Sequence, residues 1–329
     1  MKVQNYPLFS NKYSNALIIS TKVDPIKKQF EAGVYDDNGK LVKEALRQDS
    51  DYLEKEHFTQ VDLQQLNKAH ENSVDRLDGN YIYLGFYAEH YGHFLLETLS
   101  RLWAIKNPNQ YDGFIFNNFV IPRKVDKLTK IASFFFNSLG LDSTKIIILK
   151  RNTFVDNLIV PNAQCYILNK AHPKYIDIFE RLRCNVSAQN CSQLKLYLSR
   201  SKLQKRKRKV LNEHKIEEAF FQRGFQVVYM ESLSINEQLS LLANANVIAG
   251  LEGSALHNCL FMKPGSKVIN ICGLRQPSRV KPNQVMCNEL NSIDSMFIPF
   301  SGQVINEAKL IVRFDIPHLK RCLKILLFK

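Results

Sequence analysis

The second half of the chain alternates short apolar runs with helix-like segments, and this alternation constrains the fold more than any other feature. Short strands separated by helices are typical of βαβ units, whose strands join one parallel sheet. The expected strands are residues 194–200, 225–229, 247–250 and 267–271, and the expected helices are residues 213–223 and 235–244, with a third beginning near Ser254. The sequence therefore predicts an α/β fold for this half.

The first half is more mixed, although it also holds strand-like and helix-like runs. Its expected strands are residues 80–85, 113–116, 145–149 and 157–161, and its expected helices are residues 93–106 and 125–139. A chain of 329 residues, 45% of them hydrophobic, is long and apolar enough for two cores. A polar stretch at residues 185–193 then predicts domains at residues 1–187 and 188–329.

The net charge of +14 favours a polyanionic partner such as nucleic acid, anionic lipid or a phosphate-bearing substrate. Residues 202–209 hold six basic residues in eight, a run that by itself is typical of a solvated loop. The seven cysteines are scattered without a Cys-x-x-Cys pair, which indicates neither a zinc site nor a disulfide framework. Because no signal-like or membrane-length apolar run is visible, we expect a cytoplasmic protein.

A first group of candidate catalytic residues lies on the helix expected at residues 93–106. His93, Glu97 and Arg101 are spaced i, i+4 and i+8, so they would share one helix face. Glu97 could accept a proton there, while His93 and Arg101 tune its carboxylate or bind phosphate. A surface helix with an ordinary Glu–Arg pair would explain the same spacing.

A second group follows the strand expected at residues 247–250. Gly250 and Gly253 permit a tight turn, and Ser254 can cap the next helix, whose exposed N–H groups favour an anion. The carboxylate of the turn could hold ribose or sugar hydroxyl groups. The candidate ligand-binding residues are Glu252, Gly253, Ser254, Ala255, His257 and Asn258. An ordinary βα turn would show the same two glycines.

A third group, Arg200 and Lys202, follows the strand expected at residues 194–200. Ligands of open parallel sheets bind outside the carboxyl ends of the strands, so we expect both side chains in the same crevice as the glycine turn. The arginine fork pairs with phosphate oxygens, which suits a diphosphate. Asp49 and Asp51 match a two-aspartate metal motif, but they lie in a polar, helix-like stretch, so we expect neither a metal nor another cofactor.

Several segments together resemble glycosyltransferase family 61. The first is Gly-His-Phe-Leu-Leu-Glu-Thr-Leu-Ser-Arg-Leu-Trp at residues 92–103. The others, in matching order and spacing, are residues 197–200, 211–213, 237–238, 250–258 and 260–269. The resemblance implies a GT-B architecture, in which two Rossmann-like domains face each other across a cleft. It also implies an inverting, metal-independent hexosyl- or pentosyltransferase.

The resemblance further implies a role for each candidate residue. The C-terminal half would bind a nucleotide-sugar donor, commonly UDP-linked, and the N-terminal half would present the acceptor. Glu97 would be the catalytic base, with His93 as the alternative and Arg101 in support. Donor-binding roles would fall on Arg200, Lys202, Gly253, Ser254 and Ala255 for the diphosphate, and on Glu252, His257 and Asn258 for the nucleoside or sugar. Many relatives carry His at the position of Glu252.

Bacterial members of the family often build capsule or lipopolysaccharide, so the implied acceptor is a glycan or a lipid-linked glycan. Residues 317–329 form a basic, amphipathic tail, which could lie on the anionic inner face of a membrane or pack back on the N-terminal domain. The alternative functions are a nucleic-acid-binding protein and a non-catalytic nucleotide-sugar-binding protein. Aromatic residues do not interleave with the basic run, so nucleic acid is not the expected partner.

Overall fold

The computed structural model describes residues 2–24, 29–47, 74–118, 127–185, 193–203 and 208–327, with the backbone alone at residues 22–24 and 29–31. Contacts divide the chain into two compact units, residues 2–178 and residues 179–329 with Met1. This division falls inside helix α4 (Ile176–Cys184). The predicted domain boundary, between residues 187 and 188, lies outside the described residues.

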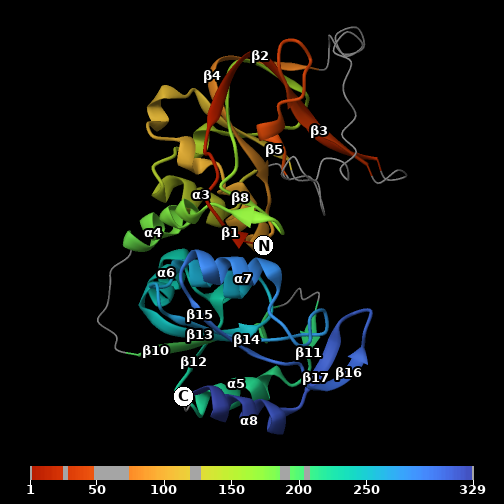
Figure 1. Ribbon diagram of the computed structural model, residues 1–329, viewed down its shortest axis with the longest axis vertical. Helices are drawn as coiled ribbons and strands as arrows, with labels where there is room; N and C mark the ends of the chain where they lie inside the picture. The colour runs from red at the N-terminus through yellow and green to blue at the C-terminus, as the bar shows by residue number, and fades with distance from the viewer. Residues whose placement is uncertain are drawn as a thin grey trace. The chain divides into compact units, whose positions relative to one another are not determined.

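The N-terminal unit is built on a six-stranded mixed sheet with the order β3-β2-β7-β4-β5-β6 (Figure 1). Its strands are β3 (Gln29–Tyr35), β2 (Ser10–Asp24), β7 (Thr153–Pro161), β4 (Asp75–Tyr87), β5 (Gly113–Asn118) and β6 (Ile146–Ile148). The last four strands of this order run parallel, whereas β2 is antiparallel to both of its neighbours. The sheet therefore differs from the all-parallel sheet of a Rossmann domain.

Short elements complete the N-terminal unit. A small sheet joins β1 (Lys2–Val3), β9 (Lys170–Ala171) and β8 (Cys165–Tyr166). Helix α3 (Lys130–Ser138) begins where the Thr129 side chain accepts a hydrogen bond from the Ala132 N–H group. Its Phe135 stacks on Phe94, with 5.6 Å between ring centroids, and this contact holds the segment after β4 against the unit.

The helix expected at residues 93–106 is instead three short pieces. They are α2 (Tyr91–His93), the π-helix η3 (Phe94–Thr98) and the 3-10 helix η4 (Leu102–Ala104). Two hydroxyl groups act at the break: Ser100 competes with regular helix for a nearby carbonyl, and Thr98 ties the segment to the end of β4. Ser100 donates to the Glu97 carbonyl at 2.6 Å, and Thr98 accepts from the Ala88 N–H and donates to the Phe86 carbonyl, both at 3.0 Å.

The C-terminal unit contains a five-stranded parallel sheet with the order β12-β10-β13-β14-β15. Its strands are β12 (Gln226–Val228), β10 (Leu194–Leu198), β13 (Ala245–Leu251), β14 (Lys267–Ile271) and β15 (Asp294–Ile298). Numbered along the chain, this order is 2-1-3-4-5, which defines a doubly wound sheet. The α/β class and the expected strands of this half are confirmed.

Helices cover both faces of this sheet (Figure 1). Helix α5 (Glu213–Phe221) lies on one face, and α6 (Ile235–Asn244), η9 (Ser254–Phe261) and α7 (Pro282–Leu290) lie together on the other. Helix α6 begins at a capping box, in which Ser234 and Glu237 bond each other's backbone N–H groups. A second sheet joins β11 (Lys209–Val210), β17 (Ile311–Phe314) and β16 (Gly302–Asn306).

The C-terminal helix α8 (Ile316–Leu327) belongs to the core of its own unit. Leu319 and Leu323 are buried in the same apolar cluster as Phe220 of α5 and Tyr197 of β10. Leu319 and Leu323 are therefore covered within this unit, and packing of the helix back on the N-terminal domain stays a prediction. Among the residues that the structure describes, no helix is long and apolar enough to cross a membrane.

We expect Leu323→Ala to lower the free energy of unfolding by about 2–5 kcal/mol, because it opens a cavity where the native side chain is fully buried. Ile325→Ala on the same helix is the matched control. That side chain is 63% exposed, so the change should stay within about 0.5 kcal/mol. Urea denaturation followed by circular dichroism measures both values. Equal, small losses for the two variants would contradict the packing of α8 in this core.

Candidate functional site

The carboxyl ends of β10 and β13 meet at the point where the strand order of the C-terminal sheet reverses. In open α/β sheets, ligands bind in the crevice at such a switch point. Arg200 follows β10 and Glu252 follows β13, and the Arg200 guanidinium donates to the Glu252 carbonyl at 3.4 Å. The sheet therefore brings together two of the residues predicted from separate motifs.

Cations surround the side chain of Glu252, which is 5% exposed. Its Oε1 atom lies 3.0 Å from Nη1 of Arg208 and 3.1 Å from Nζ of Lys281. The backbone also approaches closely, because a Cβ atom at Gly273 would lie 2.8 Å from this oxygen. Burial lowers the pKa of Lys281, and the nearby Glu252 carboxylate acts against that shift.

Two buried polar atoms at this position have no hydrogen-bond partner among the described residues: Nε of Arg200, which is a donor, and Oε2 of Glu252, which is an acceptor. Burial, together with the nearby Arg208 charge, lowers the pKa of Arg200. A pocket lies at this position. Its polar lining consists of Arg200, Arg208, Lys209, Glu252 and Arg275. The four cationic side chains suit an anionic ligand, and the single carboxylate suits hydroxyl groups on the same ligand.

The glycine turn lies beside these cations. Gly253 has φ +153° and ψ 178°, a region that is almost restricted to glycine, and a Cβ atom there would lie 3.3 Å from Nη2 of Arg208. Gly253, not Ser254, is the N-cap residue, and Ser254 and Ala255 open the 3-10 helix η9. The turn thus lies beside two cations of the pocket, although Gly253, Ser254 and Ala255 are not among the residues that line it. The predicted serine cap is wrong.

Three further predicted ligand-binding residues have other surroundings. Lys202 is exposed, and its Nζ atom lies 3.8 Å from the centroid of the Tyr229 ring. His257 is buried and donates from Nδ1 to the Gln284 side chain of α7 at 3.0 Å. Asn258 is buried in the same helix η9. None of the three is in the lining of the pocket.

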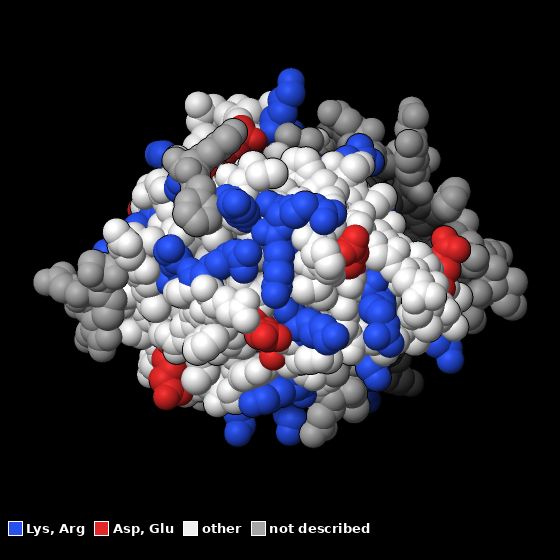
Figure 2. Space-filling model, turned by 90° about the horizontal axis from the view of Figure 1, so that it is seen from below, with Lys and Arg blue, Asp and Glu red and all other residues white. Residues whose placement is uncertain are grey.

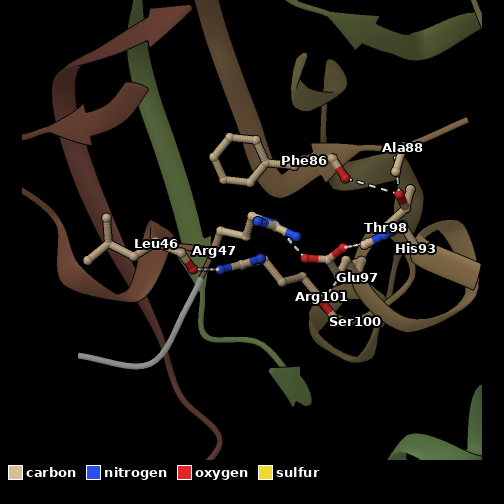
Figure 3. Close-up of polar contacts among 9 residues, drawn as sticks. All are labelled: Leu46, Arg47, Phe86, Ala88, His93, Glu97, Thr98, Ser100 and Arg101. Atoms are coloured by element: carbon tan, nitrogen blue, oxygen red, sulfur yellow. Dashed lines mark hydrogen bonds and ion pairs between the residues drawn. The ribbon is translucent and has the colours of Figure 1, made fainter. Parts of the chain in front are cut away.

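A second cluster lies in the N-terminal unit around the Glu97 carboxylate, whose side chain is 8% exposed (Figure 3). Its Oε1 atom accepts a hydrogen bond from Nε of Arg47 at 2.6 Å, and its Oε2 atom is bonded by Nδ1 of His93. Burial by itself would raise the pKa of Glu97, but the bonds from His93 and Arg47 outweigh it, and the net pKa is lowered. The carboxylate therefore stays ionised.

Arg101 does not join this cluster, contrary to the helix-face prediction. Its guanidinium donates to the carbonyl oxygens of Pro161 at 3.0 Å, Glu44 at 3.0 Å and Leu46 at 2.7 Å (Figure 3 shows the last). Burial lowers its pKa. A Cβ atom at Gly85, where φ is +90°, would lie 2.4 Å from Nη1 of this arginine. Arg101 is therefore a buried structural residue, because its donors are committed to backbone carbonyls.

The Glu97–His93 pair has the geometry of a carboxylate that orients a histidine. The His93 side chain is 33% exposed, whereas Glu97 is nearly covered. Because Nδ1 is engaged by Glu97, proton exchange between this ring and a substrate would have to use Nε2. The cluster can therefore support general base chemistry through the histidine.

Sequence reasoning missed five residues at the two clusters: Arg47, Arg208, Lys209, Arg275 and Lys281. Arg208 and Lys209 belong to the basic run that is typical of a solvated loop, and no motif marks the other three. Asp49 and Asp51 lie outside the described residues. Within those residues, no three His, Cys, Asp or Glu side chains gather as a metal site would require.

The fold and these clusters define a two-unit α/β protein with a basic pocket at a sheet switch point and a separate carboxylate–histidine pair. The family model for Glycosyltransferase 61 matches residues 91–269, which are 179 of the 329 residues and include His93, Glu97, Arg200, Arg208 and Glu252. The chain belongs to glycosyltransferase family 61, as its motifs predicted. No curated protein matches the chain.

The lowered pKa of Glu97 predicts how its contribution to stability depends on pH. Glu97→Gln should lower the free energy of unfolding by about 1–3 kcal/mol at neutral pH, since it weakens two charge-assisted hydrogen bonds. A carboxylate whose pKa is lowered by folding contributes its full stabilisation above its ordinary pKa of 4.5. That stabilisation is lost as the pH falls through the pKa of the folded state. Urea titrations of both proteins from neutral to acid pH should therefore show the difference shrinking below this value.

The control for this titration is Glu231→Gln, which changes an exposed carboxylate. We expect it to alter the free energy of unfolding by less than about 0.5 kcal/mol at every pH. A difference between wild type and Glu97→Gln that grows on acidification would contradict the assigned sign of the pKa shift.

Proposed function

We propose that the protein transfers a sugar, with inversion, from a nucleotide-sugar to a hydroxyl group of a glycan acceptor, without a metal ion. Membership of glycosyltransferase family 61 gives the general reaction. The observation that carries the proposal is the unpaired donor and acceptor, Nε of Arg200 and Oε2 of Glu252, in one basic pocket. A nucleoside diphosphate offers both an anionic oxygen and ribose hydroxyl groups to such a pair.

In the donor pocket, Arg200 and Arg208 would hold the diphosphate, with Lys281 adding positive charge nearby. The backbone N–H groups of Ser254 and Ala255 would assist at the start of η9. Fixed cations and N–H groups can stabilise the leaving diphosphate where other transferases use a divalent cation. Arg208 takes the part that the sequence assigned to Lys202, because Arg208 lines the pocket and Lys202 does not.

Glu252 would bind hydroxyl groups of the ribose or the sugar through Oε2. Its other oxygen is engaged by Arg208 and Lys281, so the carboxylate is held in place without using its whole capacity. UDP is the nucleotide that the resemblance favours. His257 and Asn258 would support the pocket from within η9 rather than contact the donor.

In the N-terminal unit, His93 would act as the base and Glu97 would orient it. Both Glu97 oxygens are already engaged and its pKa is lowered, which makes the carboxylate a weak base. In the proposed step, the acceptor oxygen forms a bond to the anomeric carbon while the bond from that carbon to the diphosphate oxygen breaks. The hydroxyl proton moves to Nε2 of His93, and the nucleoside diphosphate leaves with the bonding electron pair.

This step requires donor and acceptor to meet, so the proposal includes the GT-B arrangement of two domains facing across a cleft. The resemblance to bacterial capsule and lipopolysaccharide enzymes supports a growing surface polysaccharide as the acceptor, made on the cytoplasmic side of the membrane. A non-catalytic nucleotide-sugar-binding protein and a nucleic-acid-binding protein remain the competing functions, and each gives a different experimental result.

The donor pocket predicts selective, metal-independent nucleotide binding. In a thermal-shift panel with EDTA present, we expect one nucleoside diphosphate or its sugar to raise the melting temperature. Arg208→Ala should weaken that binding about 10- to 100-fold, because it removes charge-assisted bonds of about 1.5–3 kcal/mol. Lys202→Ala is the control and should change binding less than about twofold.

Two results would contradict this prediction. If nucleotides raise the melting temperature only after manganese is added, donor binding depends on a metal ion. Stabilisation by nucleic acid alone, with steep salt dependence, would favour the nucleic-acid-binding function.

The proposed base predicts a distinct effect on turnover, measured as release of nucleoside diphosphate from the sugar nucleotide that the panel identifies. His93→Ala should lower kcat about 10²- to 10⁴-fold while donor binding is kept. Added imidazole should restore part of this loss, and it should not restore Glu97→Gln. Full activity of His93→Ala would move the base role to Glu97, and absence of turnover in the wild type on any stabilising donor would favour the non-catalytic function.

A further inference from the structure

The outer sides of α5 and α8 form one surface of the C-terminal unit. Buried residues of both helices, including Phe220 of α5 and Leu323 of α8, enter the same apolar cluster beneath the sheet. The two helices lie side by side (Figure 1), and Arg223, which follows α5, donates to the Lys320 carbonyl of α8 at 3.3 Å. Since both helices turn their apolar sides to the same core, their opposite sides face outward together.

This surface, here called the basic helical face, is rich in cations. Its exposed residues are Lys215 and Phe221 of α5 and Lys320, Arg321, Lys324 and Ile325 of α8. Helix α8 contains no Asp or Glu between Ile316 and Leu327. The exposed acidic residue of α5 is Glu218, whose carboxylate accepts a hydrogen bond from Gln222. Figure 2 looks from below onto the side where α5 and α8 lie, and Lys and Arg side chains gather across it.

Spacing places the three cations of α8 on one side of the helix. Lys320, Arg321 and Lys324 are separated by one and by three positions, and the buried Leu319 and Leu323 lie on the other side. The helix is therefore amphipathic, but its apolar side is used inside the unit. A partner that binds the outward side of α8 therefore meets these three cations.

Two large apolar side chains accompany these cations. Phe221 at the end of α5 is 70% exposed and Ile325 of α8 is 63% exposed. Cations mixed with outward apolar side chains fit a lipid interface, where the cations meet headgroup phosphates and the apolar groups enter the acyl boundary. A nucleic acid backbone would satisfy the cations and leave the phenyl and butyl groups in water.

We propose that the basic helical face binds an anionic membrane surface. The binding uses α5 and α8 as a folded, preformed surface, and it does not need the tail to leave the core. It is independent of the proposed glycosyl transfer, because neither the pocket at Arg200 and Glu252 nor the His93–Glu97 pair takes part in it. A protein held in this way would act on acceptors carried by lipid.

The test is co-sedimentation of the full chain with phosphatidylcholine vesicles that do or do not contain phosphatidylglycerol. We expect binding only to the anionic vesicles, and we expect it to weaken as salt rises. The triple variant Lys320→Glu/Arg321→Glu/Lys324→Glu should weaken binding at least about 10-fold, since each basic residue near an anionic surface raises the affinity severalfold. Phe221→Ser/Ile325→Ser should weaken it as well, even though it leaves every charge unchanged.

The matched control is Lys12→Glu/Lys40→Glu/Lys43→Glu, which makes the same change in net charge on exposed residues of the N-terminal unit. It should bind vesicles within about twofold of wild type. Equal losses in the two charge variants would overturn the proposal, because net charge alone would then explain binding. Unchanged binding by Phe221→Ser/Ile325→Ser, with duplex DNA competing fully, would overturn the lipid assignment. Circular dichroism melting of each variant separates loss of binding from loss of fold.

Discussion

The register between β10 and β13 is the constraint on which the donor pocket depends. It pairs Leu198 with Gly250 in two parallel strands, so the chain leaves both strands at the same edge of the sheet. A side chain at Gly250 would crowd this pairing, because its Cβ atom would lie 3.2 Å from the Leu198 carbonyl oxygen. Arg200 and Glu252, each two residues beyond the pair, therefore meet although they are 52 positions apart in the chain. The pocket owes its place to sheet hydrogen bonding rather than to a local motif.

In the N-terminal unit, Arg101 has a comparable organising role. Its guanidinium binds backbone carbonyls from two distant segments, at Pro161 and at Glu44 and Leu46. Arg47 is the next residue after Leu46, so the same bonds fix the point from which Arg47 reaches the Glu97 carboxylate. A buried guanidinium is stabilised only where carbonyls surround it, and that requirement ties these segments together. The arginine predicted to support the reaction directly is therefore a positioning residue for the cluster.

Local patterns predicted the C-terminal sheet well and the site only in part. The strands β10, β12, β13 and β14 and the helices α5 and α6 fall where apolar runs and helix spacing placed them, because these signals lie within one element. The segment after β4 was predicted as one helix and is not, because Ser100 bonds the Glu97 carbonyl that a helix would use and Thr98 ties the segment to the end of β4. Arg208 looked like part of a solvated run, and nothing local shows that it reaches a carboxylate 44 positions away.

Two buried carboxylates, Glu97 and Glu252, show how similar surroundings can serve different purposes. Glu97 has a protein partner on each oxygen, Arg47 on one and His93 on the other, so it has little capacity left for a ligand. Glu252 has both of its cations, Arg208 and Lys281, on Oε1, while Oε2 has no protein donor among the described residues. A buried acceptor without a hydrogen-bond donor destabilises the fold by about 1–3 kcal/mol, and a hydroxyl group of a bound ligand would remove this penalty. The saturated carboxylate is thus suited to orient a neighbour, and the unsaturated one is suited to bind substrate.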